Sequence, residues 1–262
     1  ISENDEVILL SPTGTGKTLA YLLPLLQFLD EKKRTTQALI IVPSRELVLQ
    51  IEKVFKSLGS GIKVTACYGG HKREIEENNL IEAPALIIGT PGRLGDHIRR
   101  ENIRTSNIHT LILDEFDKSL ELGFQDEMAF VIQSLPSVRK RILISATDME
   151  GIPSFTGIHE PVKLHFESDH KDAGNKLDVQ YVKSEEKDKS ETLFRLLCSV
   201  GGRSAIVFCN HREAVERTSR LLAEKGIPNV FYHGSMEQHE RDSALSKFRN
   251  GSSYVLVTTD LA

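Results

Sequence analysis

The sequence of 262 residues contains no tryptophan and only three cysteines. The cysteines, Cys67, Cys198 and Cys209, are odd in number, lie far apart and form no CxxC pair. Disulfide frameworks need paired cysteines and zinc sites need closely spaced ligands, so this pattern argues against both. The nine histidines show no metal-ligand spacing either. We therefore expect a protein of the reducing cytoplasm.

Long hydrophobic runs are missing as well. The longest candidate, residues 20–29, contains Pro24 and Gln27 and is shorter than the roughly 18 residues that cross a bilayer. No basic segment followed by an apolar one opens the chain, which argues against a signal peptide. We expect no membrane contact. Because the first residue is Ile1 and not methionine, we also expect the sequence to be cut from a longer one.

Neither sign of charge dominates. The sequence has 33 Lys and Arg against 37 Asp and Glu, a net charge of -4 and a pI near 6.2. No positive field of the whole molecule attracts polyanions, so any contact with nucleic acid must be local. With 39% hydrophobic and 27% charged residues the composition is that of a globular protein, which excludes collagen-like and wholly disordered classes. At about 150 residues per domain, the length predicts two domains.

Apolar, β-branched runs alternate with helical patterns over the first part of the chain. Runs that are apolar on both faces are typical of parallel strands covered by helices, so an α/β fold with a parallel sheet is predicted. Ser44 is expected to cap a helix over residues 45–58, and a proline-glycine pair to open one over 91–100. The predicted strands are residues 7–10, 38–42, 64–68, 85–89, 110–114, 141–145 and 162–166.

A polar, glycine-containing segment, residues 168–175, predicts a linker between two domains. The first domain is expected over residues 1–167 and a second, incomplete one over 176–262. The second domain repeats the α/β alternation. Its predicted strands are residues 179–182, 204–209, 229–232 and 254–258, and its predicted helices are 191–200, 213–225 and 238–250.

The segment SPTGTGKT, residues 11–18, lies between a predicted strand and a predicted helix, the context of a phosphate-binding loop. Its glycines let backbone N–H groups turn toward phosphate oxygens, and a helix N-terminus favours anions. Lys17 is expected to reach the β and γ phosphates, and Thr18 to ligate Mg²⁺. The general pattern has Gly at the position of Ser11, and a turn without a ligand is the less favoured alternative. The expected ATP-binding residues are Ser11, Thr13, Gly14, Thr15, Gly16, Lys17 and Thr18.

A second candidate site follows the predicted strand 110–114, which ends in the sequence DEFD. Parallel sheets bind ligands at the carboxyl ends of their strands. Asp114 is therefore expected to hold Mg²⁺, partly through water, and Glu115 to orient the attacking water. An acidic strand end alone is more often a cap or a turn. The phosphate loop about a hundred residues upstream favours the catalytic interpretation, with Lys17 as the third catalytic residue.

Taken in order, these segments resemble the DEAD-box family of ATP-dependent RNA helicases in superfamily 2. The resemblance runs over essentially the whole chain and implies two RecA-like domains with a P-loop NTPase core. The matching segments are residues 11–18, 43–47 (PSREL), 69–70 (GG), 90–94 (TPGRL), 114–117 and 145–147 (SAT), and then 206–210 (IVFCN), 238–241 (QHER) and 258–260 (TTD).

The resemblance also assigns roles to individual residues. ATP and Mg²⁺ are the implied cofactors, and the implied partner is RNA, held through phosphates and ribose hydroxyls without reading of sequence. A local stripe of contacts would reconcile RNA binding with an acidic pI. We expect a monomer. The implied RNA-binding residues are Arg45, Gly70, Thr90, Gly92 and Arg93 in the first domain and Asn210, Arg241 and Thr259 in the second, and Asp117, Ser145 and Thr147 would couple the nucleotide site to the interdomain surface.

The sequence departs from the family pattern in several places. Phe116 stands where the family has a small alanine, so local packing must make room for a ring. Glycines and prolines punctuate residues 148–161, which predicts a short or irregular connection in place of a helix. The family's adenine-reading glutamine and its arginine fingers are absent from the 262 residues. An arginine finger is worth roughly 10³ to 10⁵ in rate, so we expect this chain alone to hydrolyse ATP poorly.

Three other functions use some of the same segments. An ATP-gated clamp that holds RNA with little turnover would carry the same motifs. A superfamily 2 DNA helicase of the RecQ type is disfavoured, because the segment 117–123 has no aromatic residue. A P-loop kinase leaves the second domain and the SAT segment unexplained. ATP-dependent unwinding of short RNA duplexes is therefore the leading hypothesis.

Overall fold

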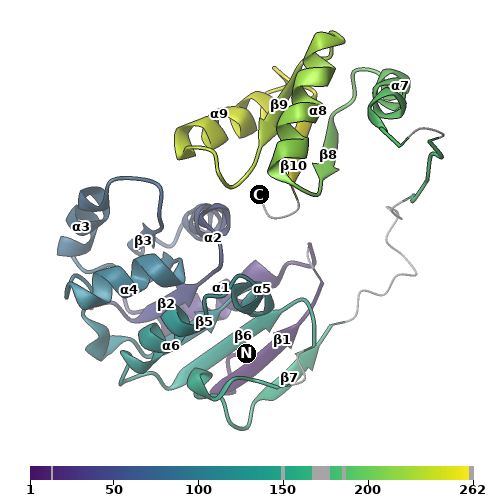
Figure 1. The fold of residues 1–262 in the computed structure, drawn as a ribbon. Coiled ribbons are helices and arrows are strands. Elements are labelled where there is room, and N and C mark those ends of the chain that lie inside the picture. The colour runs from purple at the N-terminus through teal and green to yellow at the C-terminus, as the bar shows by residue number, and fades with distance from the viewer. Residues whose placement is uncertain (13, 149–150, 167–177, 185–186, 260–262) are drawn as a thin grey trace. The chain divides into compact units, whose positions relative to one another are not determined.

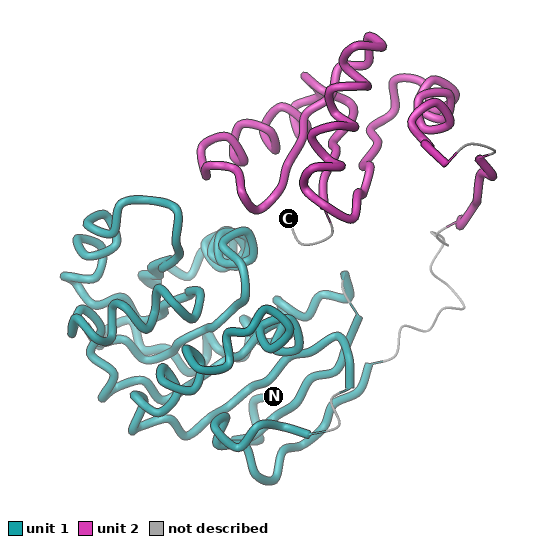
Figure 2. The backbone as a smooth tube through the Cα atoms, in the orientation of Figure 1, with its two compact units in different colours: residues 1–173 teal, residues 174–262 magenta. Residues whose placement is uncertain are grey.

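The computed structural model describes residues 1–12, 14–148, 151–166, 178–184 and 187–259 (Figure 1). The chain divides into two compact units, residues 1–173 and 174–262 (Figure 2). The predicted linker, residues 168–175, lies outside the described residues. No helix within the described residues is long and apolar enough to cross a membrane.

Unit 1 is built around one sheet of seven parallel strands, in the order β3-β4-β2-β5-β6-β1-β7. All seven strands predicted for this part of the chain form, with ends shifted by no more than one residue. They are β1 (Glu6–Leu10), β2 (Ala38–Ile41), β3 (Val64–Cys67), β4 (Leu86–Gly89), β5 (Thr110–Leu113), β6 (Lys140–Ser145) and β7 (Val162–His165).

Helices cover both faces of this sheet (Figure 1). Successive residues of the central strands belong alternately to two hydrophobic clusters, one on each face. Leu22, Ile51 and Phe55 of α1 and α2 pack into one cluster, and Leu94 and Val131 of α4 and α6 into the other. The helices are α1 (Lys17–Phe28), α2 (Arg45–Ser57), α3 (Arg73–Ile81), α4 (Pro91–Arg99), α5 (Phe116–Glu121) and α6 (Gln125–Gln133).

Two expectations about local structure in unit 1 are confirmed. The Ser44 hydroxyl accepts a hydrogen bond from the Leu47 N–H at 3.2 Å and so caps α2. The connection between β6 and β7 is irregular, and the described part of it contains only a 3-10 turn, Ser154–Thr156.

Unit 2 has a three-stranded parallel sheet in the order β8-β10-β9. Its core is small and contains Leu197, Val215, Leu222, Val255 and Val257. The elements are α7 (Ser190–Val200), β8 (Ala205–Cys209), α8 (Arg212–Glu224), β9 (Asn229–Tyr232), α9 (Gln238–Arg249) and β10 (Val255–Thr259).

The prediction of a strand over residues 179–182 is wrong. Val179, Tyr181 and Val182 are β-branched or aromatic, yet they are 81%, 94% and 60% exposed and pair with no strand among the described residues. Strand propensity measures how well a side chain fits a half-buried pleated surface, and a lone segment without a partner has no such surface.

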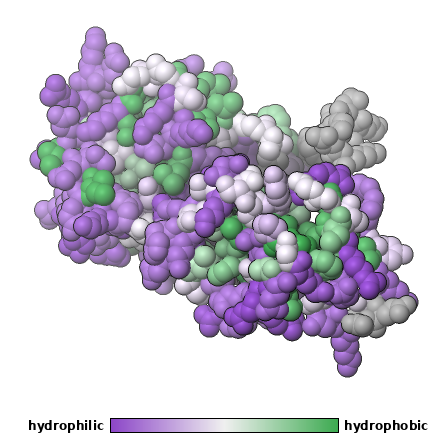
Figure 3. Space-filling model, turned by 90° about the horizontal axis from the view of Figure 1, so that it is seen from above, coloured by the Kyte–Doolittle hydropathy of each residue, from purple (hydrophilic) through white to green (hydrophobic). Residues whose placement is uncertain are grey.

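One face of β8 also exposes large hydrophobic side chains, Ile206 at 51% and Phe208 at 67%. The surface seen in Figure 3 is mainly hydrophilic, with hydrophobic residues gathered in several places. The alternation of exposed and half-buried residues along β8 is that of a strand with only one covered face.

Candidate nucleotide and RNA sites

The phosphate loop connects β1 to α1, as expected. Gly14 and Gly16 have φ of 80° and 88°, a left-handed conformation that other residues rarely adopt. The Thr15 hydroxyl donates to the Pro12 carbonyl at 2.9 Å, so the Ser11 hydroxyl, 2.6 Å from Thr15 Oγ1, donates to Thr15. Ser11 thus ties the loop to itself where the general pattern has glycine. Thr13, also expected at this site, lies outside the described residues.

Lys17 begins α1, and Thr18 follows it. The Lys17 Nζ atom is buried, yet it has no hydrogen-bond partner among the described residues. Burial raises the pKa values of both Asp114 and Glu115, and the charge of Lys17 opposes that rise. A buried, unpartnered ammonium beside a glycine-rich helix N-terminus is the donor set that a nucleotide phosphate requires.

Asp114 follows β5 and is only 3% exposed. Its Oδ2 accepts a hydrogen bond from the Tyr21 hydroxyl at 2.8 Å, and its Oδ1 accepts one from the Glu115 N–H at 2.9 Å. Burial raises the pKa of Asp114, and the hydrogen bond from Tyr21 and the charge of Lys17 oppose the rise. A buried carboxylate beside the phosphate loop fits a hard divalent cation, for which the Thr18 hydroxyl could supply a second oxygen.

Glu115 has a left-handed backbone, with φ of 48°, at the residue that caps α5. Such strain in a residue other than glycine is concentrated at functional sites. Burial raises the pKa of Glu115, and the neighbouring charge of Asp114 raises it further. A carboxylate with a raised pKa is a stronger base than an ordinary glutamate.

The three predicted coupling residues form one hydrogen-bonded cluster. Asp117 Oδ2 accepts from the Thr147 hydroxyl at 2.8 Å and from the Thr147 N–H at 3.2 Å. The Ser145 hydroxyl donates to the Thr147 carbonyl at 2.6 Å. Burial alone would raise the pKa of Asp117, but the hydrogen bonds that its carboxylate accepts together lower it. The Ser11 N–H donates to the Ser145 carbonyl at 3.2 Å, which connects the cluster to the phosphate loop.

The five RNA-binding candidates of unit 1 lie on the other half of the same carboxyl edge. Arg45 begins α2 after β2, Gly70 follows β3, and Thr90, Gly92 and Arg93 lie where β4 leads into α4. Because β3, β4 and β2 are neighbours, these segments come together, whereas the loops after β5, β6 and β1 carry the nucleotide candidates. The strand order therefore separates two sets of residues along one edge.

In unit 2, Asn210 directly follows β8 and Thr259 ends β10. These strands are neighbours, with Cys209 opposite Thr259, so Asn210 and Thr259 share one sheet edge. Arg241 lies in the first turn of α9, and its Nε atom is buried without a hydrogen-bond partner among the described residues. The candidates of this unit are thus carried by two strand ends and a helix.

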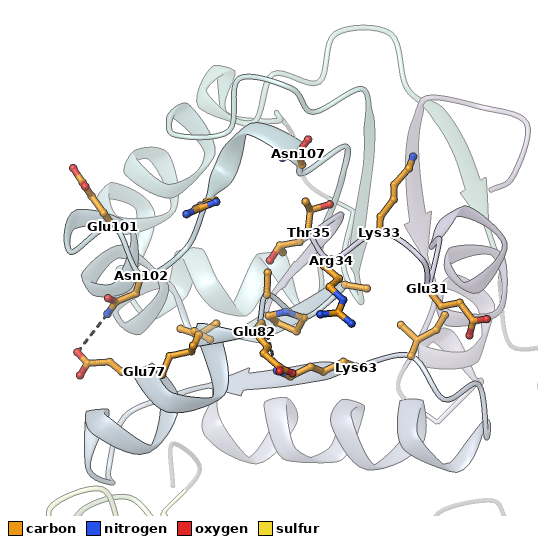
Figure 4. Close-up of a pocket in the computed structure, with 18 of the residues that line it drawn as sticks. Glu31, Lys33, Arg34, Thr35, Lys63, Glu77, Glu82, Glu101, Asn102 and Asn107 are labelled. Carbon is orange, nitrogen blue, oxygen red and sulfur yellow. Dashed lines mark hydrogen bonds and ion pairs between the residues drawn. The ribbon is translucent and has the colours of Figure 1, made fainter.

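A cavity of about 720 Å³ lies elsewhere in unit 1 (Figure 4). Its lining comes from segments that precede β2, β3, β4 and β5, at the amino edge of the sheet and away from the candidate sites. Lys33, Arg34 and Lys63 alternate there with Glu31 and Glu82. Charges of both signs select no single class of ligand.

One residue of the nucleotide region, Tyr21, was not identified by the sequence analysis. Tyr21, fully buried, is the hydrogen-bond donor to Asp114 across 93 positions of sequence. It lies one turn after Lys17 on α1, and that helical spacing was the available signal. Phe116 was expected to need room, and its ring is fully buried, 6.2 Å from the ring of Phe155.

A parallel sheet whose carboxyl edge carries a phosphate loop, a buried aspartate and a half-buried glutamate next to it defines the P-loop class of nucleotide-binding folds. Residues 1–151 match the family model of the DEAD/DEAH box helicases, and residues 188–262 match the helicase conserved C-terminal domain. The chain belongs to the DEAD/DEAH box helicase family.

Relatives of known name are similar over nearly the whole chain. ATP-dependent RNA helicase CshA of Listeria monocytogenes is 36% identical over 99% of this chain and 51% of its own length. ATP-dependent RNA helicase DbpA of Escherichia coli is 36% identical over 95% and 55%. The chain thus spans about half the length of these relatives. Among solved structures, S. cerevisiae Dbp5 bound to RNA and ADP BeF3 has a TM-score of 0.79 and 26% identity, over 98% of this chain and 66% of that one.

Proposed function

We propose that this chain is the core of an ATP-dependent RNA helicase, which couples ATP binding and hydrolysis to RNA binding and to separation of short duplexes. The observation that carries the proposal is the carboxyl edge of the unit 1 sheet, where one half holds the phosphate loop with its acidic pair and the other holds arginines and glycines. Residues 1–167 and 176–262 would be the two RecA-like domains. The Dbp5 structure with RNA and a nucleotide supports the same pairing of ligands.

The nucleotide site would work through a few side chains. Backbone N–H groups of the phosphate loop and the Lys17 ammonium would bind the β and γ phosphates. Thr18 and Asp114 would hold Mg²⁺, partly through water, and the ion would neutralise charge on the phosphate oxygens. Glu115, with its raised pKa, would orient the attacking water and accept its proton.

RNA would lie across the remaining candidates of unit 1 and those of unit 2. Arginine side chains and the N–H groups of exposed glycines such as Gly70 and Gly92 suit phosphate oxygens, whereas none of these groups forms a surface for reading bases. Binding would therefore be independent of sequence. Asp117, through its hydrogen bonds to Thr147, would pass a change at the phosphate site to the segment after β6.

Phosphate release tests the proposal, measured with and without single-stranded RNA on the protein made from its complete reading frame. We expect RNA to stimulate ATP hydrolysis at least about tenfold, with strand separation of a short duplex that depends on ATP. Hydrolysis that RNA does not stimulate would rule out the helicase. ATP-dependent RNA binding with very slow turnover would instead identify an ATP-gated clamp.

Replacement of Tyr21 tests the electrostatics of this site. Tyr21→Phe removes the hydrogen bond that lowers the pKa of Asp114, so that pKa should rise further. Asp114 is then protonated at a higher pH, and we expect the acid limb of the kcat/KM profile to move upward, measured between about pH 5 and 8. Tyr181→Phe, at a 94% exposed position, is the matched control. An acid limb that stays in place contradicts the role given to Tyr21.

A further inference from the structure

Glu76 is a buried carboxylate that no predicted motif includes. It lies on α3 and its side chain is only 1% exposed. Its Oε1 accepts a hydrogen bond from the Tyr68 N–H at 2.8 Å and lies 3.1 Å from His71 Nε2. Its Oε2 lies 2.6 Å from His97 Nε2 and 3.6 Å from Arg93 Nε. Buried carboxylates are costly unless paired, and this one has partners at both oxygens.

The partners of Glu76 belong to the segments expected to bind RNA. Tyr68 and His71 flank the glycine pair after β3, and Arg93 and His97 lie on α4 after the TPG sequence. Arg93 also donates to the His71 carbonyl at 3.3 Å. A single carboxylate therefore joins the loop after β3 to the start of α4.

The contacts extend from this cluster to a third segment. The Tyr68 and His71 rings are 4.5 Å apart, and the Arg45 guanidinium lies 5.1 Å from the centre of the Tyr68 ring. A cation over an aromatic face is attracted by the ring quadrupole. The glycine pair, Arg93 and Arg45 are thus all one or two contacts away from Glu76.

His97 defines the polarity of the cluster. Its Nδ1 lies 3.1 Å from Nδ2 of Asn102, which is an amide donor, so Nδ1 accepts. Nε2 of the neutral ring then carries the proton and donates it to Glu76. His97 is fully buried, and without a carboxylate oxygen its N–H would lose its acceptor.

We propose that Glu76 is a positioning residue that holds the glycine pair and Arg93 in the orientation that binds an RNA phosphate. Glu76 is too deeply buried to touch RNA itself. Arg93 has 15% of its side chain exposed, and the buried acid, 3.6 Å from its Nε atom, would orient the guanidinium toward a phosphate. This inference rests on the proposed RNA-binding function.

The same region contains three groups of the kinds that bind metals. Cys67 Sγ and polar atoms of Glu76 and His97 lie within 4.8 Å of one another. Burial raises the pKa of the Cys67 thiol well above its usual range, which disfavours the thiolate that a metal needs. Both oxygens of Glu76 also have hydrogen-bond partners. The geometry therefore favours a hydrogen-bonded cluster around Glu76 over a metal site.

The experiment compares Glu76→Gln and Arg93→Ala, singly and together, in the protein made from its complete reading frame. The amide of Glu76→Gln has the shape of the carboxylate but carries no negative charge to attract Arg93. Its NH2 group also places a donor where the carboxylate oxygen accepted a hydrogen bond. We expect the KM for RNA to rise about tenfold, with kcat at saturating RNA and ATP affinity within about twofold of wild type. The double variant should bind RNA no more weakly than Arg93→Ala alone. Glu74→Gln, exposed on the same helix, is the matched control.

Each other outcome has a definite meaning. If Arg93→Ala weakens RNA binding and Glu76→Gln does not, or if their effects simply add, the positioning role is wrong while the proposed function stands. If Arg93→Ala itself leaves RNA binding unchanged, the RNA contact proposed for Arg93 fails. Loss of ATP affinity in Glu76→Gln would indicate a general structural defect and overturn the inference. Should that variant not fold, Glu76→Asp, which keeps the charge but shortens the reach, should give an intermediate rise in KM. If the purified protein contained stoichiometric zinc whose removal lowered the RNA affinity, the interpretation of the Glu76 region as a hydrogen-bonded cluster would be wrong.

Discussion

Glu115→Gln should lower the kcat of ATP hydrolysis at least about 100-fold and leave ATP affinity within about twofold of wild type. The amide has nearly the same shape as the carboxylate, so the left-handed turn before α5 and the neighbouring Asp114 keep their places. It cannot accept a proton from water, whereas the carboxylate, with its raised pKa, can. Phosphate release at saturating ATP and RNA, together with a nucleotide titration, measures both quantities.

Glu101→Gln is the control for this substitution. Among the described residues other than glycine, Glu101 shares a positive φ with Glu115. Its φ is 60°, but it is exposed and lies at the amino edge of the sheet. Glu101→Gln places an amide at a residue with positive φ that lies away from the nucleotide site, and ATP turnover should be unchanged. Turnover that also survives Glu115→Gln would refute the catalytic role of Glu115.

Lys17→Ala should weaken ATP binding at least about tenfold, because it removes a buried ammonium whose charge acts on the acidic pair. The Lys17 charge lowers the pKa values of Asp114 and Glu115, so its loss should also raise both and narrow the active pH range from the acid side. Titration with a fluorescent ATP analogue measures the affinity, and the pH dependence of the remaining turnover measures the second effect.

Lys33→Ala, at a position whose side chain is 66% exposed, provides the comparison for this loss of a charge. It should leave ATP binding and turnover as they are, since its ion pair with Asp30 is at the surface. Intact ATP affinity in Lys17→Ala would count against the assignment of the phosphate loop.

Much of unit 1 could be predicted because its signals are local. A run that is apolar on both faces identifies a buried parallel strand wherever it occurs, and SPTGTGKT after such a run fixes the start of α1. The order of the strands is not local. Nothing in the sequence places β4 between β3 and β2, yet this order gathers Arg45, Gly70 and Arg93 on one half of the edge.

The supporting residues could not be predicted for a related reason. Tyr21 reads as one apolar residue of an amphipathic helix, and its role depends on Asp114, 93 positions away. Glu76 reads as one of several acidic residues on a polar helix, and it is buried only by tertiary contacts, which include the packing of α3 against β3 and the α4 residues His97 and Arg93. The segment 179–182 shows the reverse case, since its strand-like residues found no partner among the described strands.

The contact between Phe116 and Phe155 links the two departures from the family pattern. Phe116 enlarges the DEFD sequence, and Phe155 belongs to the irregular connection between β6 and β7, where it packs against the same cluster. Because protein cores are closely packed, the residues around the Phe116 ring must leave a space that matches its volume. The two changes are therefore expected to be inherited together: a relative with alanine in place of Phe116 would need a bulkier connection to fill the space, and exchanging either segment alone between relatives would leave a void or a clash.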